Sequence, residues 1–289
     1  MAAMHVIDHW NPEDKGFWER SGRGVATRNL WLSIPALTLA FAVWMLWSVV
    51  VVHLPAAGFR FSTNQLFWLA ALPALCGATL RIFYAFAVPV VGGRRFTALA
   101  TASLLLPALG IGFAVQDPGT PYELMIALAL LCGLGGGNFA SSMAHISFFY
   151  PKSKLGYALG MNAGLGHLGV SLVQFVVPLV ITAGIFGALG GAPANVNQGS
   201  TQAQMWLQNA GFVWVPFIVA SALAVHNGQP PPSARQARPH HADRPRVEGA
   251  LDADQGVRRV GVHLGCAGEC QREENGDIHG PAPQDPESV

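Results

Sequence analysis

One arginine could bind a ligand in this chain, because it lies near the middle of a long apolar stretch. Arg81 is the single charged residue between positions 66 and 91. A charge at that depth costs roughly 2.5–3.5 kcal/mol on insertion scales, so such residues usually face a partner or a cavity. No Asp or Glu occurs from 20 to 116 or from 124 to 242. We therefore predict that Arg81 binds an anion from outside the chain. The alternative is a guanidinium that reaches one membrane face or bonds to backbone carbonyls.

Three other polar side chains lie in apolar stretches, namely Asn138, Asn162 and His167. Each can hydrogen-bond to a polar ligand or to a neighbouring helix, and the residues alone leave both roles open. Phe41 and Phe139 could stack on a flat ligand, although contact with lipid or core is the more common role of a single Phe.

Small residues crowd the segment from 133 to 171. Gly160, Gly164, His167 and Ser171 recur at steps of three and four, so they share one helix face. In membranes, small residues at such spacing let helix backbones approach closely. This pattern predicts a tightly packed helix pair beside any ligand.

The composition indicates a membrane protein. Of the 289 residues, 51% are hydrophobic and 11% are charged, against about 25% charged in soluble domains. The net charge of +1 gives no reason to expect a nucleic-acid partner, so the expected surroundings are a lipid bilayer. The apolar stretches contain no catalytic or metal-binding arrangement. We therefore predict a protein that is not an enzyme and that uses no metal or cofactor.

Six apolar runs define the expected membrane domain, residues 31–225. The sixth has 15 residues, short of the roughly 20 that span a bilayer, so we expect it to be incomplete. Residues 183–210 are expected to form an exposed loop, and the polar tail 226–289 to be disordered. The expected helices cover residues 31–52, 66–91, 96–115, 122–149, 155–182 and 211–225.

Lys and Arg alternate between the connecting segments. Segment 1–30, the turn at 94–95 and the turn at 152–154 carry eight basic residues together, whereas the alternate loops carry only Arg60. By the positive-inside rule, the N-terminal segment 1–30 is predicted to be cytoplasmic. The expected location is the cell inner (plasma) membrane.

Several short motifs lie in and beside these apolar runs, at residues 28–31 (RNLW), 41–45 (FAVWM), 92–95 (GGRR), 114–117 (AVQD), 138–144 (NFASSMA), 148–149 (FF) with 151, 158–160 (ALG) and 162–171. Through these motifs, residues from about 11 to 225 closely resemble the N-terminal half of nitrate/nitrite porters of the major facilitator superfamily. The most specific region starts at Asn138 and continues through Ser171.

The resemblance implies an all-α polytopic fold made of one six-helix half, with the substrate between two such halves. It places Arg81 at the family's nitrate-binding arginine and Phe139 at an aromatic near the substrate. His167 stands where the family commonly has Asn; a neutral His can donate a hydrogen bond, and a protonated one adds positive charge. The implied function is transport of nitrate and nitrite. Exchange, with nitrate import and nitrite export, is favoured because the spans hold no proton-carrying carboxylate.

The resemblance stops at Val225, where the composition changes abruptly at His226. We interpret the chain as a truncated or frameshifted product. The competing interpretations are a remnant that does not transport and a half that works only by association with another porter half.

Overall fold

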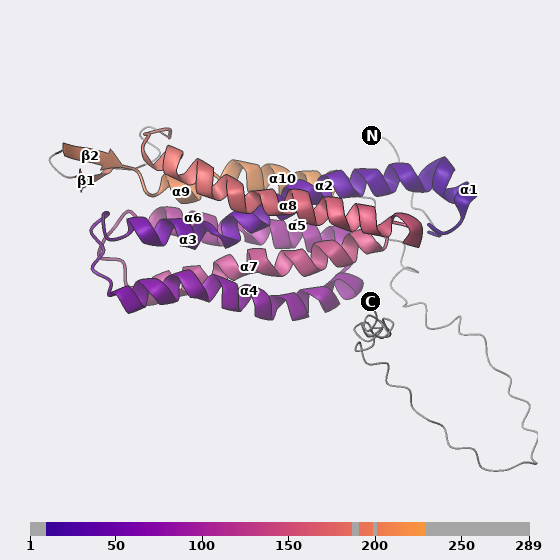
Figure 1. Cartoon of the computed structure of the whole chain (residues 1–289), viewed down its shortest axis with the longest axis horizontal. Coiled ribbons are helices and arrows are strands. Elements are labelled where there is room, and N and C mark those ends of the chain that lie inside the picture. Colours follow the sequence, from indigo (N-terminus) through magenta and orange to yellow (C-terminus); the bar gives the residue numbers. More distant parts are fainter. Residues whose placement is uncertain (1–9, 187–190, 199–200, 229–289) are drawn as a thin grey trace, which may run out of the picture. The chain divides into compact units, whose positions relative to one another are not determined.

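The computed structural model describes residues 10–186, 191–198 and 201–228. Within that part, six helical segments are long and apolar enough to cross a membrane. They lie side by side (Figure 1), as the prediction of an all-α polytopic fold requires. Most of the predicted tail, residues 229–289, lies outside the described residues.

Short breaks divide several of the six segments into separate helices. The elements, in chain order, are α1 (Lys15–Phe17), the π-helical turn η1 (Trp18–Gly22), α2 (Arg23–Trp44), α3 (Leu46–His53), α4 (Thr63–Val91), α5 (Gly93–Ser103), α6 (Leu105–Ala114), α7 (Tyr122–Ser147), α8 (Lys152–Ile181), β1 (Ala194–Gln198), β2 (Thr201–Met205), α9 (Asn209–Phe212) and α10 (Val215–Gly228).

Local signals set several helix ends. α4 begins with a capping box, in which Ser62 accepts from the Gln65 backbone and the Gln65 side chain accepts from the Ser62 backbone. This pair satisfies two donors that a helix start otherwise leaves free. α4 ends at Val91 and is capped by Gly92, whose φ of 89° suits glycine. α8 begins directly after Pro151.

The first membrane segment begins earlier than residue 31. Helical structure starts at Lys15, and α2 runs without interruption from Arg23. Asn29 and Leu30, within the predicted segment 1–30, are 0% and 3% exposed. The boundary at residue 30 is therefore corrected, because polar side chains in this first part pack inside the bundle rather than face solvent.

The sixth segment is also longer than predicted. It reaches from Asn209 to Gly228, 20 residues in all, so the expectation of an incomplete sixth helix is corrected. The loop before it is not simply exposed: β1 and β2 pair as an antiparallel hairpin, and Leu207 is 1% exposed. The amide of Asn209 donates to the carbonyls of Val180 and Ala183 at 2.9 and 2.8 Å. These bonds hold the start of the segment against the end of α8.

α7 is the central helix for the site. It packs against both α4 and α2, and α2 also packs against α8. In the most apolar part of α7, 56% of the residues are buried, compared with 11% in α4 and 28% in α8. α4 and α8 therefore present most of their surface to whatever surrounds this bundle.

Candidate functional site

The Arg81 guanidinium lies against α7 and between aromatic side chains. Its Nε donates a hydrogen bond to the Gly136 carbonyl at 3.1 Å. Its Cζ lies 5.3 Å from the ring centroid of Trp44 and 5.3 Å from that of Phe139, within the range of cation–π attraction. Within the described part of the chain, its terminal nitrogens have no hydrogen-bond partner. The backbone contact thus occupies the Nε edge of the guanidinium and leaves the two terminal nitrogens available to a ligand.

A group of four ring side chains lies beside Arg81, and we call it the aromatic cluster. Its members are Phe41, Trp44, Phe139 and His167. The Phe41 ring lies 4.2 Å from the His167 ring, 5.7 Å from Trp44 and 5.9 Å from Phe139, centroid to centroid. The Phe139 and His167 rings are 5.8 Å apart. Four of the six predicted site residues therefore meet, although they come from α2, α4, α7 and α8.

Glycines allow Arg81 to reach α7. A Cβ on Gly136 would lie 2.9 Å from the Gly77 Cα and 3.0 Å from the Trp44 ring. A Cβ on Gly77 would lie 2.8 Å from Trp44 Nε1. Since real side chains do not tolerate such contacts, the close approach of α4 to α7 requires glycine on both helices.

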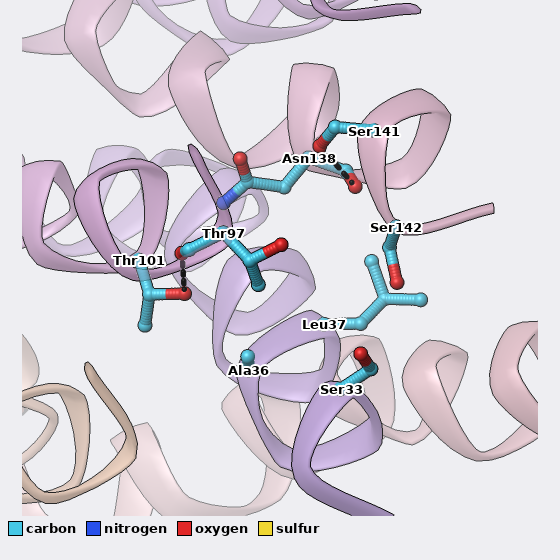
Figure 2. A pocket seen from close by; sticks show the side chains of 8 residues that line it. All are labelled: Ser33, Ala36, Leu37, Thr97, Thr101, Asn138, Ser141 and Ser142. Atoms are coloured by element: carbon cyan, nitrogen blue, oxygen red, sulfur yellow. Dashed lines mark hydrogen bonds between the residues drawn. The ribbon is translucent and has the colours of Figure 1, made fainter. Parts of the chain in front are cut away.

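Asn138 points away from this cluster. It is 6% exposed and its Nδ2 donates to the Ala100 carbonyl at 3.4 Å. It lines a small cavity between α2, α5 and α7 (Figure 2). Asn138 therefore takes the helix-contact role that the sequence left open for it.

Asn162 is held inside the bundle. It is 0% exposed, and its Nδ2 donates to the Ser142 hydroxyl at 2.8 Å. The structure thus joins Asn162 to α7 by a hydrogen bond between helices, and does not bring it to Arg81.

Trp44 is the contact residue that reasoning from the sequence did not single out. Its Nε1 donates to the Pro73 carbonyl at 2.8 Å, which fixes its ring beside Arg81. The spacing of three residues from Phe41 was the available signal, because residues at i and i+3 share a helix face.

No protein-family model matches the chain, but individual proteins do. The chain is 50% identical over 226 residues to the nitrate/nitrite transporter NarU of Escherichia coli (strain K12), a match that covers 78% of this chain and 48% of that protein. It is 48% identical over 218 residues to the probable nitrate/nitrite antiporter NarK2 of Thermus thermophilus, covering 75% and 48%. Over its matched part, this chain is therefore similar to the first half or so of nitrate/nitrite transporters.

The six candidate membrane spans agree with a multi-pass membrane protein. A third relative, the probable nitrate/nitrite antiporter NarK1 of Thermus thermophilus, is 32% identical over 199 residues, covering 68% of this chain and 40% of that protein. The chain spans about half the length of the first relatives it matches. Its six helical segments correspond to one half of the two-half architecture.

We expect replacement of Trp44 to weaken anion binding by loosening Arg81. Trp44→Leu removes the ring and its hydrogen bond, whereas Trp44→Phe keeps a ring and loses the bond to Pro73. A cation–π contact contributes about 1 kcal/mol, so nitrate affinity should fall roughly fivefold in the Leu variant and less in the Phe variant. The measurement is the nitrate-dependent rise in melting temperature of the purified chain.

Trp31→Leu is the matched control for this test. Trp31 is on the same helix but 56% exposed, so its loss should leave nitrate affinity unchanged. Equal losses in the Trp31 and Trp44 variants would contradict the positioning role.

Proposed function

We propose that this porter chain forms one half of a transporter that exchanges nitrate and nitrite, with Arg81 as the anion-binding group. The observation that carries the proposal is the guanidinium held beside Trp44 and Phe139 with its terminal nitrogens open. A planar guanidinium suits a planar oxyanion, which can accept two parallel hydrogen bonds. Phe41, Phe139 and His167 would form the wall around the bound ion.

The chemistry of the described helices favours anion exchange. Between residues 20 and 116 and between 124 and 242 the chain has no carboxylate, so the bound anion would neutralise Arg81. An empty site would leave the cation uncompensated inside the membrane, at a free-energy cost. A carrier of this kind favours crossing the membrane loaded, with nitrate in one direction and nitrite in the other.

The open face of α8 supports the need for a second half. A Cβ added to Gly156, Gly160 or Gly164 would meet no atom within 4 Å, although such glycine spacing serves close helix contact. His167 and Ser171 continue the same face and are exposed. We place the second half against this face, where it would close the site beside Arg81.

The transport experiment compares two kinds of vesicle. Vesicles with this chain alone are tested for exchange of isotopically labelled nitrate against nitrite. They are compared with vesicles that also hold the separately expressed part of the Escherichia coli relative that this chain does not span. We expect exchange only when both parts are present. Nitrate binding without exchange in either case would favour the alternative, a remnant that binds but does not transport.

We further propose that the N-terminus is cytoplasmic in the inner (plasma) membrane. The segments with eight basic residues lie at one end of the bundle: the Lys152 backbone donates to Glu13 at 2.9 Å, and Gly93 lies against the His145 ring. Alkaline phosphatase is active only outside the cytoplasm. Fused after Arg60 it should therefore be active, and fused after Lys152 it should be inactive. The reverse pattern would overturn the orientation.

A further inference from the structure

His167 is hydrogen-bonded in a way that fixes which ring nitrogen carries the proton. Its Nδ1 lies 2.7 Å from the Ala163 carbonyl oxygen. A carbonyl oxygen only accepts, so Nδ1 must be the donor. In the neutral ring the remaining nitrogen, Nε2, then holds a lone pair and no hydrogen. A neutral His167 therefore presents an acceptor to its surroundings, and an acceptor repels an anion.

Protonation reverses this polarity. In the imidazolium both nitrogens are donors, so Nε2 can donate while Nδ1 keeps its bond to Ala163. The Phe41 ring lies 4.2 Å from the His167 ring at an interplanar angle of 33°, where an aromatic face can attract a cation. The ring is exposed and, within the described residues, Nε2 has no hydrogen-bond partner.

Arg81 on α4 is the charged group of this cluster that shares a neighbour with His167: its Cζ lies 5.3 Å from the Phe139 ring centroid, and the His167 ring lies 5.8 Å from the same centroid. The residues of α2 and α7 in the cluster, Phe41, Trp44 and Phe139, do not titrate. Arg81 opposes a second positive charge at His167. An anion bound between them would remove that opposition.

We propose that this site binds its anion together with one proton, held on His167. This inference rests on the proposed function, because it assumes that Arg81 binds nitrate. Binding of the proton and binding of the anion then favour each other by linkage. With histidine at position 167, the chain would carry an oxyanion plus a proton. With an amide side chain at the same position, it would carry the oxyanion alone.

The experiment measures nitrate affinity and proton uptake of the purified full chain between pH 5 and 8, the range in which histidine ordinarily changes charge. The affinity should be highest at low pH. It should fall as pH rises, approaching about tenfold per pH unit for one linked proton. Nitrate added to weakly buffered protein should take up protons, whereas chloride should not.

Two variants make the result specific. His167→Asn keeps a hydrogen-bond donor without a titratable charge, so its nitrate affinity should not depend on pH. His53 makes the same bond to its own helix, from Nδ1 to the Val49 carbonyl at 2.9 Å, but lies outside the cluster. His53→Asn should therefore behave like the unaltered chain. Nitrate binding that does not change with pH would overturn the proton proposal alone, whereas absence of nitrate binding at every pH would overturn the proposed function.

An independent observation concerns the cavity between α2, α5 and α7. Figure 2 shows the hydroxyls of Ser33, Thr97 and Ser142 directed toward it from three helices. Ser33 Oγ and Thr97 Oγ1 are buried without a hydrogen-bond partner. The Ser142 hydroxyl accepts from Asn162, which leaves its own hydrogen available. The cavity volume, measured for the centre of a water-sized sphere, is about 10 Å³, the room that one water needs.

We also infer that this cavity holds one structural water molecule bonded to these three hydroxyls. Buried waters typically make about three hydrogen bonds to groups that otherwise lack partners. The polar side chains that line the cavity are all neutral and include no carboxylate, which favours water over a divalent cation. The water would complete a chain of hydrogen bonds from Asn162 on α8 through Ser142 to α5 and α2.

The test uses an isosteric substitution that should lower the melting temperature if the cavity holds a water molecule, and leave it unchanged or raise it if the cavity is dry. If the cavity is wet, Thr97→Val removes a partner of the water, and the melting temperature should fall by about 2–4 °C. The loss should not add to that of Ser33→Ala, because both act on one water. Thr97→Ser keeps the hydroxyl and should retain this coupling. An unchanged or higher melting temperature in Thr97→Val would mean a dry cavity and overturn the inference.

Thr101→Val is the matched control, because the Thr101 hydroxyl already donates to the Thr97 carbonyl of its own helix at 2.7 Å. Its effect should add to that of Ser33→Ala. A stabilisation by sodium that is absent with choline at equal ionic strength would identify a cation in place of water and would also overturn the inference.

Discussion

Arg81→Gln should abolish measurable nitrate binding by this chain. Glutamine can still donate hydrogen bonds, but it carries no charge and lacks the two-pronged geometry of the guanidinium. Two charge-assisted hydrogen bonds contribute about 3 kcal/mol or more, so the affinity should fall more than about 100-fold. Calorimetric titration with nitrate, at constant ionic strength against chloride, measures the loss.

The same substitution should not destabilise the fold. Arg81 carries an insertion cost that offsets its hydrogen bond to one backbone carbonyl and its two ring contacts, with Trp44 and Phe139. The melting temperature without nitrate should therefore stay the same or rise. Arg60→Gln is the control, because Arg60 is an exposed arginine in the loop between α3 and α4. Unchanged nitrate binding in Arg81→Gln would show that the anion binds elsewhere.

Gly136→Ala should disrupt the contact between α4 and α7 and, with it, the position of Arg81. The new methyl would lie 2.9 Å from the Gly77 backbone and 3.0 Å from the Trp44 ring, and the backbone cannot move aside as a side chain can. Overpacking of this kind costs about 1–3 kcal/mol. We expect a lower melting temperature and weaker nitrate binding together.

Gly164→Ala provides the matched control on α8. A methyl there meets no atom within 4 Å, and Ala is favoured over Gly in a helix by roughly 0.5–1 kcal/mol. The chain alone should keep its stability and its nitrate binding. Exchange in vesicles that hold the second half should nevertheless fall, because the methyl would lie in the proposed contact. Equal effects of the two alanines on the chain alone would contradict the packing described for Gly136.

The periodicity and composition predicted the helices better than their ends. Apolar runs of membrane length are visible in the sequence because each must cross the same thickness of hydrocarbon. The first helix starts earlier than predicted, because Asn29 is polar yet fully buried. The sixth is longer than predicted, because Asn209 and His226, polar residues at its two ends, lie within its 20 residues. Polarity marks the end of a helix only where the side chain faces water.

By itself the sequence determined that Arg81 is a charge in the membrane without a carboxylate, since depth and composition are local properties. It also indicated the resemblance to nitrate/nitrite porters, through motifs that lie in the part of the chain that is 50% identical to the Escherichia coli relative. Only the tertiary structure decided which polar residues share a site. Asn138, Asn162 and His167 look equivalent as polar residues in apolar runs, but helix rotation buries the first two against neighbouring helices and brings the third beside Phe41. Trp44 joins Arg81 because glycines let two helices approach, a relation between distant residues that no local pattern contains.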